Sequence, residues 1–592
     1  MTRWVISILL LLHVLPNSLL AKQTKKYDLN EDLFPIPSEL IPNIDFWISV
    51  FSQYSGKQAV LHDTQDLNII YEVADFSNVS EDTLKSWRLK QRMVDKIKDK
   101  YRDILTKLSK IKPADVPKLS PEEKRIYDLF EGQQNSNRFR LAQYNIRAQF
   151  GLREEFLQGL IRSGTFIDEM QEIFRENGLP EELTCLPHVE SSFNYNAYSK
   201  VGAAGMWQFT RKTGRRYVKI NYAVDDRLDP IRATEAAAKF LKNNYETLQA
   251  WPLAITAYNH GVNGMKRARK IVGTDDFGVI LKKYRSRTFK FASRNFYAEF
   301  IAAVQVRKNY RHYFGNIALD APLDAVYFEL PKSCNFKKLT ELFQVENDVL
   351  RKYNPSIRPA AYSGGQQLHK GFSLRLPKEK SLEIADAFAY FMQTKSTPVT
   401  LENIENMRPQ TVTLSKKQDE KSAARISEKK EMFYLPHVNL SELLLSNTIT
   451  LSSDENLEDI ADWLEITMEQ LYQINNLQED EEIGIGQEIK LDFCNVTPYI
   501  FHNRRFEYHQ SIEDDFLLYF EITGVRIHQL QPGEDVWTLC DDVYEIPYWL
   551  LLKYNENLKL DDLKDGDEII FPVVVALAEK NSEMMAPGSE GE

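Results

Sequence analysis

The sequence has few cysteines for its length. Its 592 residues include four, Cys185, Cys334, Cys494 and Cys540. Four dispersed cysteines are too few for a disulfide scaffold, and none stands in a C-x-x-C pair that would suggest a zinc site. Buried thiols without a disulfide are the simplest interpretation.

Basic residues are also too few for a general nucleic-acid binder. The chain has 74 Lys and Arg against 85 Asp and Glu, a formal charge of −11, which argues against nucleic acid as a partner. The charge is unevenly distributed. Residues 151–316 contain 26 basic and 17 acidic residues, a net +9, whereas residues 431–592 contain 8 and 35, a net −27. One block is therefore cationic and the C-terminal block is strongly acidic.

Apolar runs long enough to cross a membrane are missing as well. The one marked run, residues 5–12 (VISILLLL), is shorter than the span of about 20 residues that a bilayer requires. It follows Arg3 and leads to Ala21, so residues 1–21 are predicted to be a secretory signal peptide. A retained N-terminal anchor is the alternative, but no cysteine follows the run, which excludes a lipoprotein. The mature protein is expected to be soluble outside the cytoplasm.

The remaining length is sufficient for several domains. Residues 22–150 have a mostly helical pattern, strongest at 87–108, and this region is expected to serve in packing or spacing. Residues 151–316 are also helix-rich, with helices expected at 234–248 and 251–258. The centre of this second region breaks the helical pattern, and irregular backbone between helices often carries binding or catalytic residues.

The C-terminal half contains a loose repeat. Each copy has the order strand, helix, helix, strand, and the copies span residues 326–377, 448–491 and 527–573. The last copy is the clearest and the first is degenerate, with a long insertion. Residues 397–430 are polar and are expected to be a linker, and residues 574–592 a disordered tail. The expected fold is multidomain, with a mainly α domain and small α+β (βααβ) repeats.

Glu190 is the candidate catalytic residue. It ends a largely apolar helix, where desolvation raises the pKa of a carboxyl toward neutrality, as a general acid requires. Two glycines in residues 191–209 allow a ligand to approach the backbone closely, and Trp207, Gln208 and Phe209 offer a stacking surface and an amide. Each residue alone has an ordinary structural explanation, such as a solvated carboxylate or a core aromatic. Their combination favours a site.

This combination resembles the lytic transglycosylases of the goose-lysozyme-like type. Their signature, E-S-x-[FY] followed by S-x-x-G-A-x-G-[LM]-[WM]-Q-[FIL], stands here at residues 190–193 and 199–209. A later A-Y-N-x-G motif stands at 257–261, and residues 294–297 (RNFY) are similar to the last motif. The repeats resemble lysin motifs, which one branch of the family carries after its catalytic domain. The lipoprotein cysteine usual in that branch is missing here.

The resemblance implies a lysozyme-like catalytic domain over residues 151–316. Glu190 would protonate the β-1,4 bond between N-acetylmuramic acid and N-acetylglucosamine, and would then accept the proton of the muramoyl 6-hydroxyl. That hydroxyl closes on C1 and gives a 1,6-anhydro end without water. One carboxylate therefore suffices, where hydrolytic glycosidases use two. No cofactor and no metal are implied.

The resemblance also implies a set of substrate-contacting residues and a partner. Four residues would contact the sugar chain, namely Ser191, Met206, Gln208 and Phe209. Three more would line the cleft and position the acid or the sugar, namely Tyr258, Asn259 and Tyr297, although core packing is the alternative for both tyrosines. The partner would be peptidoglycan glycan strands, with association with the cell wall or membrane surface. The expected location is the bacterial cell envelope or periplasm.

Two other functions remain possible from the sequence. A hydrolase would need a second carboxylate to activate water, and the nearest candidates, Asp225, Asp226 and Asp229, are better explained as helix caps. A non-catalytic wall-binding protein would not need the acid. The cationic block is expected either to attract the anionic polymer or to be simply solvated. The repeats, on polar segments, are expected to raise the local concentration of enzyme on the polymer without altering the chemistry.

Overall fold

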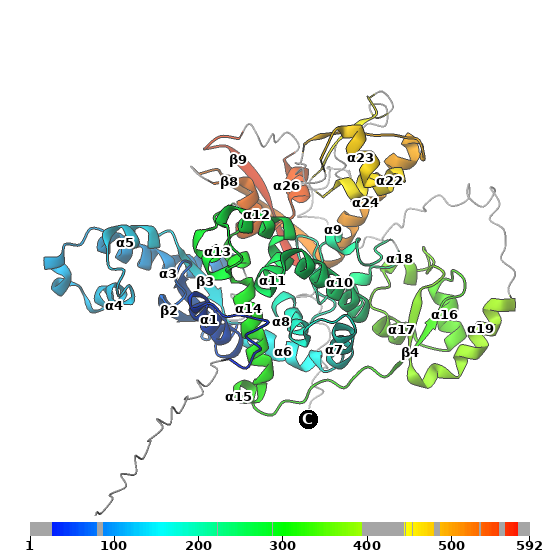
Figure 1. Cartoon of the computed structure of the whole chain (residues 1–592), viewed down its shortest axis with the longest axis horizontal. Helices are drawn as coiled ribbons and strands as arrows, with labels where there is room; N and C mark the ends of the chain where they lie inside the picture. The colour runs from blue at the N-terminus through cyan, green and yellow to red at the C-terminus, as the bar shows by residue number, and fades with distance from the viewer. Residues whose placement is uncertain are drawn as a thin grey trace, which may run out of the picture.

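The computed structural model describes residues 27–79, 87–221, 223–286, 288–393, 443, 446–452, 454–478, 486–531, 534–555 and 563–577. A helical core occupies the centre, an N-terminal α/β region extends from one end, and a βααβ unit lies at the other (Figure 1). Two further βααβ units lie along one side of the core. The predicted multidomain fold, mainly α with small α+β units, is confirmed. Among the described residues, no helix has the length and apolarity needed to cross a membrane.

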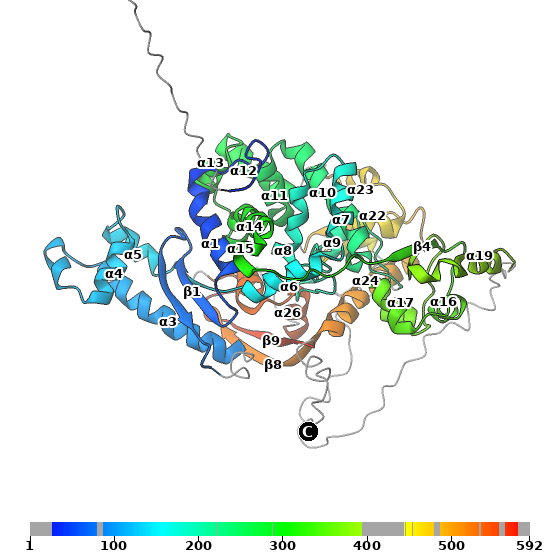
Figure 2. The ribbon, with the colours of Figure 1, turned by 90° about the horizontal axis from the view of Figure 1, so that it is seen from below.

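The core is built around the buried helix α14 (Phe291–Lys308). The other core helices are α1 (Ile41–Ser52), α6 (Arg153–Ser163), α7 (Ile167–Glu176), α8 (Leu186–Glu190), α9 (Arg211–Gly214), α10 (Pro230–Leu248), α11 (Trp251–His260), α12 (Val262–Val272), α13 (Phe277–Lys283) and α15 (Tyr310–Phe314). Helices α1, α8 and α11 pack on α14 (Figure 2). The same apolar cluster includes Phe34 and Trp47, so the start of the N-terminal region packs as part of this core.

Helix α10 illustrates how the sequence determines an element of the core. The side chain of Asp229 accepts hydrogen bonds from the backbone N–H groups of Ile231 and Arg232, and Pro230 occupies the first turn. A carboxylate cap followed by proline is a strong helix start. The helix ends at Leu248, where Gln249 takes a left-handed conformation. The helices predicted at 234–248 and 251–258 are both present.

The N-terminal region, predicted to be mostly helical, also contains a three-stranded sheet. The strands β1 (Gln58–Asp63), β2 (Ile70–Asp75) and β3 (Ile146–Phe150) form an antiparallel sheet in the order β2-β1-β3. Both β1 and β2 contain β-branched residues, and Val60 pairs with Val73, which favours a pleated sheet. The predicted helix 87–108 is present as α3 (Trp87–Leu108), followed by α4 (Pro121–Leu129) and α5 (Ser136–Ala142).

Each of the three repeats forms a βααβ unit with an antiparallel strand pair. The first unit has β4 (Ala325–Glu329), α16 (Phe336–Phe343), α17 (Asn347–Tyr353), α18 (Pro359–Tyr362) and β5 (Ser373–Pro377), and α19 (Glu383–Gln393) follows it. The second has β6 (Thr448–Thr450), α22 (Leu457–Leu464), α23 (Met468–Asn475) and β7 (Glu488–Lys490). The third has β8 (Phe520–Gln529), α25 (Val536–Thr538), the π-helical turn Leu539–Tyr544, α26 (Tyr548–Tyr554) and β9 (Glu568–Ala576).

The described residues correct both predicted boundaries of the third copy. Strand β8 begins at Phe520, ahead of the predicted start at residue 527. Residues 574–576, expected in a disordered tail, continue strand β9, because Val574 and Val575 pair with Ile522 and Glu521 of β8. The predicted signal peptide, linker 397–430 and tail beyond 577 lie outside the described residues.

Helix α24 (Pro498–Tyr519), which joins the second and third units, was not predicted. Its polar residues are buried in ion pairs, so its sequence shows no clear apolar face. Arg505 donates two hydrogen bonds to Glu455, whose carboxylate also contacts the His509 ring at 2.7 Å. Because both partners come from distant positions, local periodicity could not reveal the helix.

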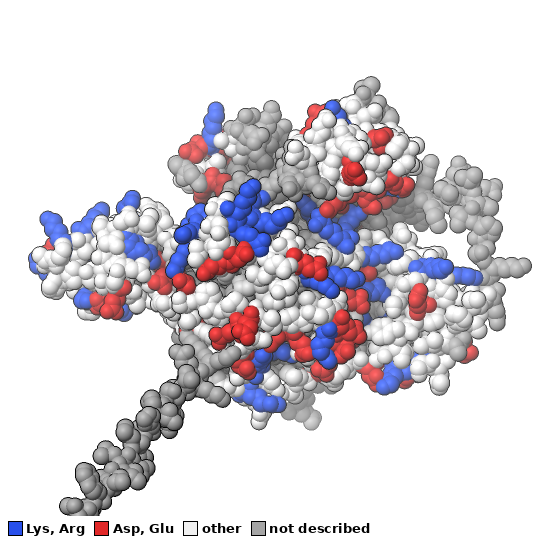
Figure 3. All heavy atoms as spheres, in the orientation of Figure 1, with Lys and Arg blue, Asp and Glu red and all other residues white. Residues whose placement is uncertain are grey.

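The acidic second and third units lie against the cationic core. Asp515 of α24 accepts from Arg211 of α9 at 2.6 Å and also pairs with Arg358 of the first unit. Arg215 pairs with Asp459 of α22 at 3.0 Å. In Figure 3, acidic side chains on the second unit face basic ones over α9. Part of the opposite charge of the two blocks is therefore paired within the chain.

Candidate active site

The short helix α8 carries Glu190 at its last position. The His188 ring holds this helix in the core, with its centroid 4.7 Å from Phe156 and 4.5 Å from Phe193. Neither nitrogen of His188 has a hydrogen-bond partner among the described residues, and burial lowers the pKa of His188 well below its usual value. His188 is therefore neutral and acts as an aromatic packing residue next to the acid.

A strained turn follows Glu190. Ser192 and Phe193 have φ values of 51° and 58°, in the left-handed region. Arg162 of α6 donates a hydrogen bond to the Ser192 carbonyl at 2.6 Å. Gly159 of α6 approaches the same carbonyl so closely that an added Cβ would lie 2.9 Å from its oxygen. Helix α6 thus fixes the chain direction immediately after the acid.

The carboxyl of Glu190 is half-buried and uncharged at neutral pH. Burial, together with the charge of Glu299, raises the pKa of Glu190 to about 8. Burial and the charge of Glu190 likewise raise the pKa of Tyr258, on α11, well above its usual value. Glu190, Tyr258 and Glu299 therefore form one electrostatically coupled group from α8, α11 and α14.

Glu299 was missed by the sequence analysis. It is half-buried on α14, and burial raises its pKa to about 8 against the opposing charge of Arg147 on β3. The signal was a lone carboxylate within the otherwise apolar stretch of α14, where Phe296 and Phe300 are buried. Unpaired Glu is rarely buried, so a carboxylate in that setting is a candidate for a functional role.

The signature loop is held in place mainly by its own side chains. Ser191 donates from Oγ to the Met206 carbonyl at 2.8 Å, and Gln208 donates from Nε2 to the Gly205 carbonyl at 2.8 Å. Met206 and Phe209 are 0% and 2% exposed. In this structure these four predicted substrate contacts therefore shape the loop, and Met206 and Phe209 form the floor beneath it.

Buried Arg227 fixes the base of the loop. Its guanidinium donates to the carbonyls of Gly202 and Phe209 at 2.8 and 3.1 Å, and pairs with Asp225 at 2.7 Å. Gly205 has φ 77°, and a Cβ there would lie 1.8 Å from the Arg227 carbonyl oxygen. No other residue than glycine fits at this position without moving the backbone.

The three aspartates considered for water activation have structural partners. Asp225 caps the turn Asp226–Leu228, Asp226 pairs with Arg232 at 2.7 Å, and Asp229 caps α10 and binds Arg375. Capping accounts for Asp225 and Asp229 as predicted. The prediction is wrong for Asp226, which is held by its ion pair and caps none of the described helices.

The three residues expected to line the cleft have different environments. Tyr258 donates its hydroxyl to the Trp207 carbonyl at 2.7 Å, which ties α11 to the signature loop. Asn259 is exposed and accepts a hydrogen bond from Ser293 of α14. Tyr297 is fully buried, and its hydroxyl donates to the Pro35 carbonyl. The structure thus places Tyr258 beside the acid and Tyr297 in the core.

Comparison with protein-family models identifies two domains. Residues 170–280 match the Transglycosylase SLT domain, and residues 449–492 match the LysM domain. The chain contains a transglycosylase SLT domain and a LysM domain. The SLT match includes Glu190, the signature loop and Tyr258. The LysM match covers the second βααβ unit, whereas the sequence pattern favoured the third as the clearest copy.

Two curated relatives and one solved structure are similar to parts of the chain. Membrane-bound lytic murein transglycosylase D of Escherichia coli (strain K12) is 25% identical over 187 residues, 31% of this chain and 41% of that protein. A putative tributyltin chloride resistance protein of Alteromonas sp. (strain M-1) is 37% identical over 95 residues, 16% of this chain and 46% of that protein. The chain thus spans less than half the length of these relatives. An X-ray structure of an inactive mutant of lytic transglycosylase Slt from Pseudomonas aeruginosa has a TM-score of 0.21 and 17% identity, covering 26% of this chain and 25% of that one.

Proposed function

We propose that this protein is a peptidoglycan lytic transglycosylase. It cleaves the β-1,4 bond between N-acetylmuramic acid and N-acetylglucosamine without consuming water, and leaves 1,6-anhydromuramoyl ends. The observation that supports this most strongly is the carboxyl of Glu190, half-buried with a pKa of about 8 within the SLT domain. A protonated carboxyl at neutral pH is what the first step requires.

In the proposed reaction the Glu190 carboxyl gives its proton to the glycosidic oxygen as the bond from C1 to that oxygen breaks. The resulting Glu190 carboxylate then accepts the proton of the muramoyl 6-hydroxyl as that oxygen bonds to C1. The acid is regenerated, and neither water nor a cofactor is consumed. The strained turn at Ser192 and Phe193 and the Tyr258 contact to Trp207 hold the loop and acid in a fixed arrangement.

Glu299 supports a second candidate function. A hydrolase needs a second carboxylate to activate water, and Glu299 is close enough to raise the pKa of Glu190. However, burial raises the pKa of Glu299 to about 8 as well. A base that is protonated at neutral pH is poorly suited to activating water, so the transglycosylase is favoured.

Digestion of purified sacculi, followed by mass analysis of the released fragments, tests this function. Wild-type protein should release fragments lighter by one water than the hydrolysis products. Glu190→Gln removes the proton and keeps the shape, so the rate should fall by roughly two to four orders of magnitude. The control Glu176→Gln, at an exposed position of α7, should retain wild-type activity. Reducing ends would instead support the hydrolase, and no release by wild type would support a non-catalytic wall-binding protein.

We further propose glycan strands as the binding partner of the βααβ units, and the bacterial cell envelope as the location. The LysM domain at residues 449–492 supports this proposal. The envelope location is also expected from the signal-peptide pattern of the sequence. Cell-wall remodelling or turnover is the process that such an enzyme would serve.

A further inference from the structure

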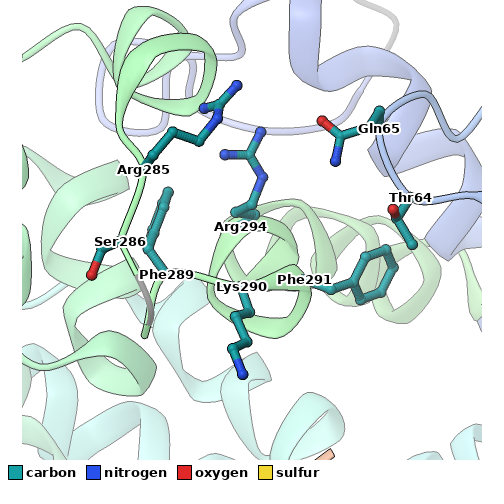
Figure 4. A pocket seen from close by; sticks show the side chains of 8 residues that line it. All are labelled: Thr64, Gln65, Arg285, Ser286, Phe289, Lys290, Phe291 and Arg294. Atoms are coloured by element: carbon teal, nitrogen blue, oxygen red, sulfur yellow. The ribbon is translucent and has the colours of Figure 1, made fainter. Parts of the chain in front are cut away.

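A cavity separates the loop after β1 from the segment that leads into α14. Its volume is about 530 Å³. It is lined by Thr64, Gln65, Arg285, Ser286, Phe289, Lys290, Phe291 and Arg294. Figure 4 shows the side chains of Arg285 and Arg294 close together, with Gln65 and Thr64 across the cavity.

The lining is cationic without a compensating acid. Three of its eight residues are Arg or Lys, and none is Asp or Glu. The side chain of Arg294 has no hydrogen bond or ion pair with the described part of the chain, and its guanidinium lies 5.8 Å from the centroid of the Phe289 ring. Burial and the neighbouring charge of Arg285 lower the pKa of Arg294. Arg285 is exposed and donates to the carbonyls of Leu281 and Tyr284. An anion between the two guanidinium groups would offset their repulsion.

The cavity lies at the start of α14, the helix that also carries Glu299. Phe291 lines it, and the guanidinium of Arg147 lies 4.5 Å above the Phe291 ring. The charge of Arg147 lowers the pKa of Glu299, and the charge of Glu299 raises the pKa of Glu190. Glu299 follows Arg294 by five residues, about 8 Å along the helix axis. The cavity and Glu299, the charged neighbour of Glu190, thus lie on the same helix.

We propose that this cavity binds a carboxylate of the stem peptide of the peptidoglycan strand. The inference rests on the proposed function, since it assigns a second binding site for the same substrate. Arginine forks bind carboxylates with two parallel hydrogen bonds. The rings of Phe289 and Phe291 offer an apolar floor for a peptide, and Thr64 and Gln65 offer a hydroxyl and an amide for its backbone groups. A strand stripped of its peptides keeps only the lactyl carboxylate of each muramoyl ring, which lies next to the sugar chain and does not extend away from it as a peptide carboxylate does.

Kinetics on two matched substrates test the proposal. One is purified glycan strands that carry stem peptides, and the other is the same strands after an amidase has removed the peptides. Arg285→Gln and Arg294→Gln should each raise KM for the peptide-bearing strands about tenfold relative to the stripped strands, because each removes a charge-assisted hydrogen bond. Arg311→Gln, an exposed arginine of α15, removes the same charge elsewhere and should not change this ratio.

The outcomes separate this proposal from the proposed function. If wild-type protein releases no anhydro products from either substrate, the proposed function fails. If products form and neither Arg285→Gln nor Arg294→Gln changes the KM ratio, the cavity assignment alone is overturned. An equal rise of KM on both substrates would also overturn it, since that would indicate a site for the sugar chain.

A calorimetric titration identifies the source of the anion. The free stem peptide should bind wild-type protein, and Arg294→Gln should weaken this binding about tenfold. Binding of inorganic phosphate without binding of the peptide would overturn the assignment to the stem peptide. Arg285→Gln provides the same test at an exposed side chain, where a folding defect is not expected.

Discussion

The ring of Tyr198, in the signature loop, stacks on the ring of Tyr519 at the end of α24, with centroids 4.5 Å apart and planes 3° from parallel. The loop that follows Glu190 is thus in direct contact with the C-terminal block. This differs from the sequence-based expectation that the repeats are only tethered through polar segments. The acidic block covers part of the cationic surface for which the sequence left two expectations, attraction of the anionic polymer or simple solvation.

Asp515→Asn should destabilise the protein strongly. The side chains of Asp515, Arg358 and Arg211 are 4%, 7% and 11% exposed, so this is a buried ion cluster rather than a surface pair. Removing one partner of a buried pair typically costs about 3–5 kcal/mol, because it leaves charges buried without compensation. Urea unfolding measures the loss, with Asp565→Asn, at an exposed position, as control. Equal unfolding midpoints for both variants would show that the contact is not formed in solution.

Deletion of residues 378–592 should have two effects. Retention on insoluble peptidoglycan should fall, because the LysM domain is removed. The unfolding temperature should also fall, because Arg211 and Arg358 lose Asp515 and Tyr198 becomes exposed.

Full-length Asp515→Asn is the matched control for this deletion, because it breaks the docking contact and keeps the βααβ units. It should be retained like wild type. Equal retention of the deleted and intact proteins would mean that the second and third units do not bind the glycan. An unchanged unfolding temperature of the deletion variant would mean that docking of these units does not contribute to the thermal stability of the core.

Gly205→Ala should be far more damaging than Gly202→Ala. Both glycines have a left-handed φ, which costs about 1 kcal/mol for alanine. At Gly202 an added Cβ meets open space, whereas at Gly205 it would lie 1.8 Å from the Arg227 carbonyl oxygen. Thermal unfolding and activity of the two variants measure the difference. Similar losses in both would show that the backbones are not in close contact there.

The sequence predicted elements whose signals are local. Helix α3, the start of α10 at Asp229 and the βααβ repeats follow from periodicity, capping and repetition. It did not predict α24, because Arg505 and Glu455, which stabilise that helix, are 50 residues apart. It also missed Glu299 as a neighbour of Glu190, because only tertiary packing brings α8 and α14 together. The burial of Tyr297 could not be predicted either, because its hydroxyl bonds to the carbonyl of Pro35, which is distant in the sequence.

The pH dependence of activity should reflect both carboxyls. Glu190 must be protonated to act as the acid, so activity should be present below its pKa and should fall as the pH rises through about 8. Glu299→Gln removes a charge that raises this pKa, so the high-pH limb should move to lower pH.

Rates of Glu299→Gln across the pH range also test its role. If the high-pH limb moves to lower pH and activity at low pH is retained, Glu299 acts only by raising the pKa of Glu190. Loss of activity by orders of magnitude at every pH would instead identify Glu299 as the base of a hydrolase. Glu176→Gln again serves as the exposed control.

Digestion of sacculi in water enriched in heavy oxygen tests the central claim most directly. If Glu190 catalyses closure of the 6-hydroxyl on C1, the released muramoyl ends are 1,6-anhydro and carry no label. Glu190→Gln protein should release neither kind of end above background. Reducing muramoyl ends that contain heavy oxygen would contradict the account, because they would show that water, not the 6-hydroxyl, attacks C1.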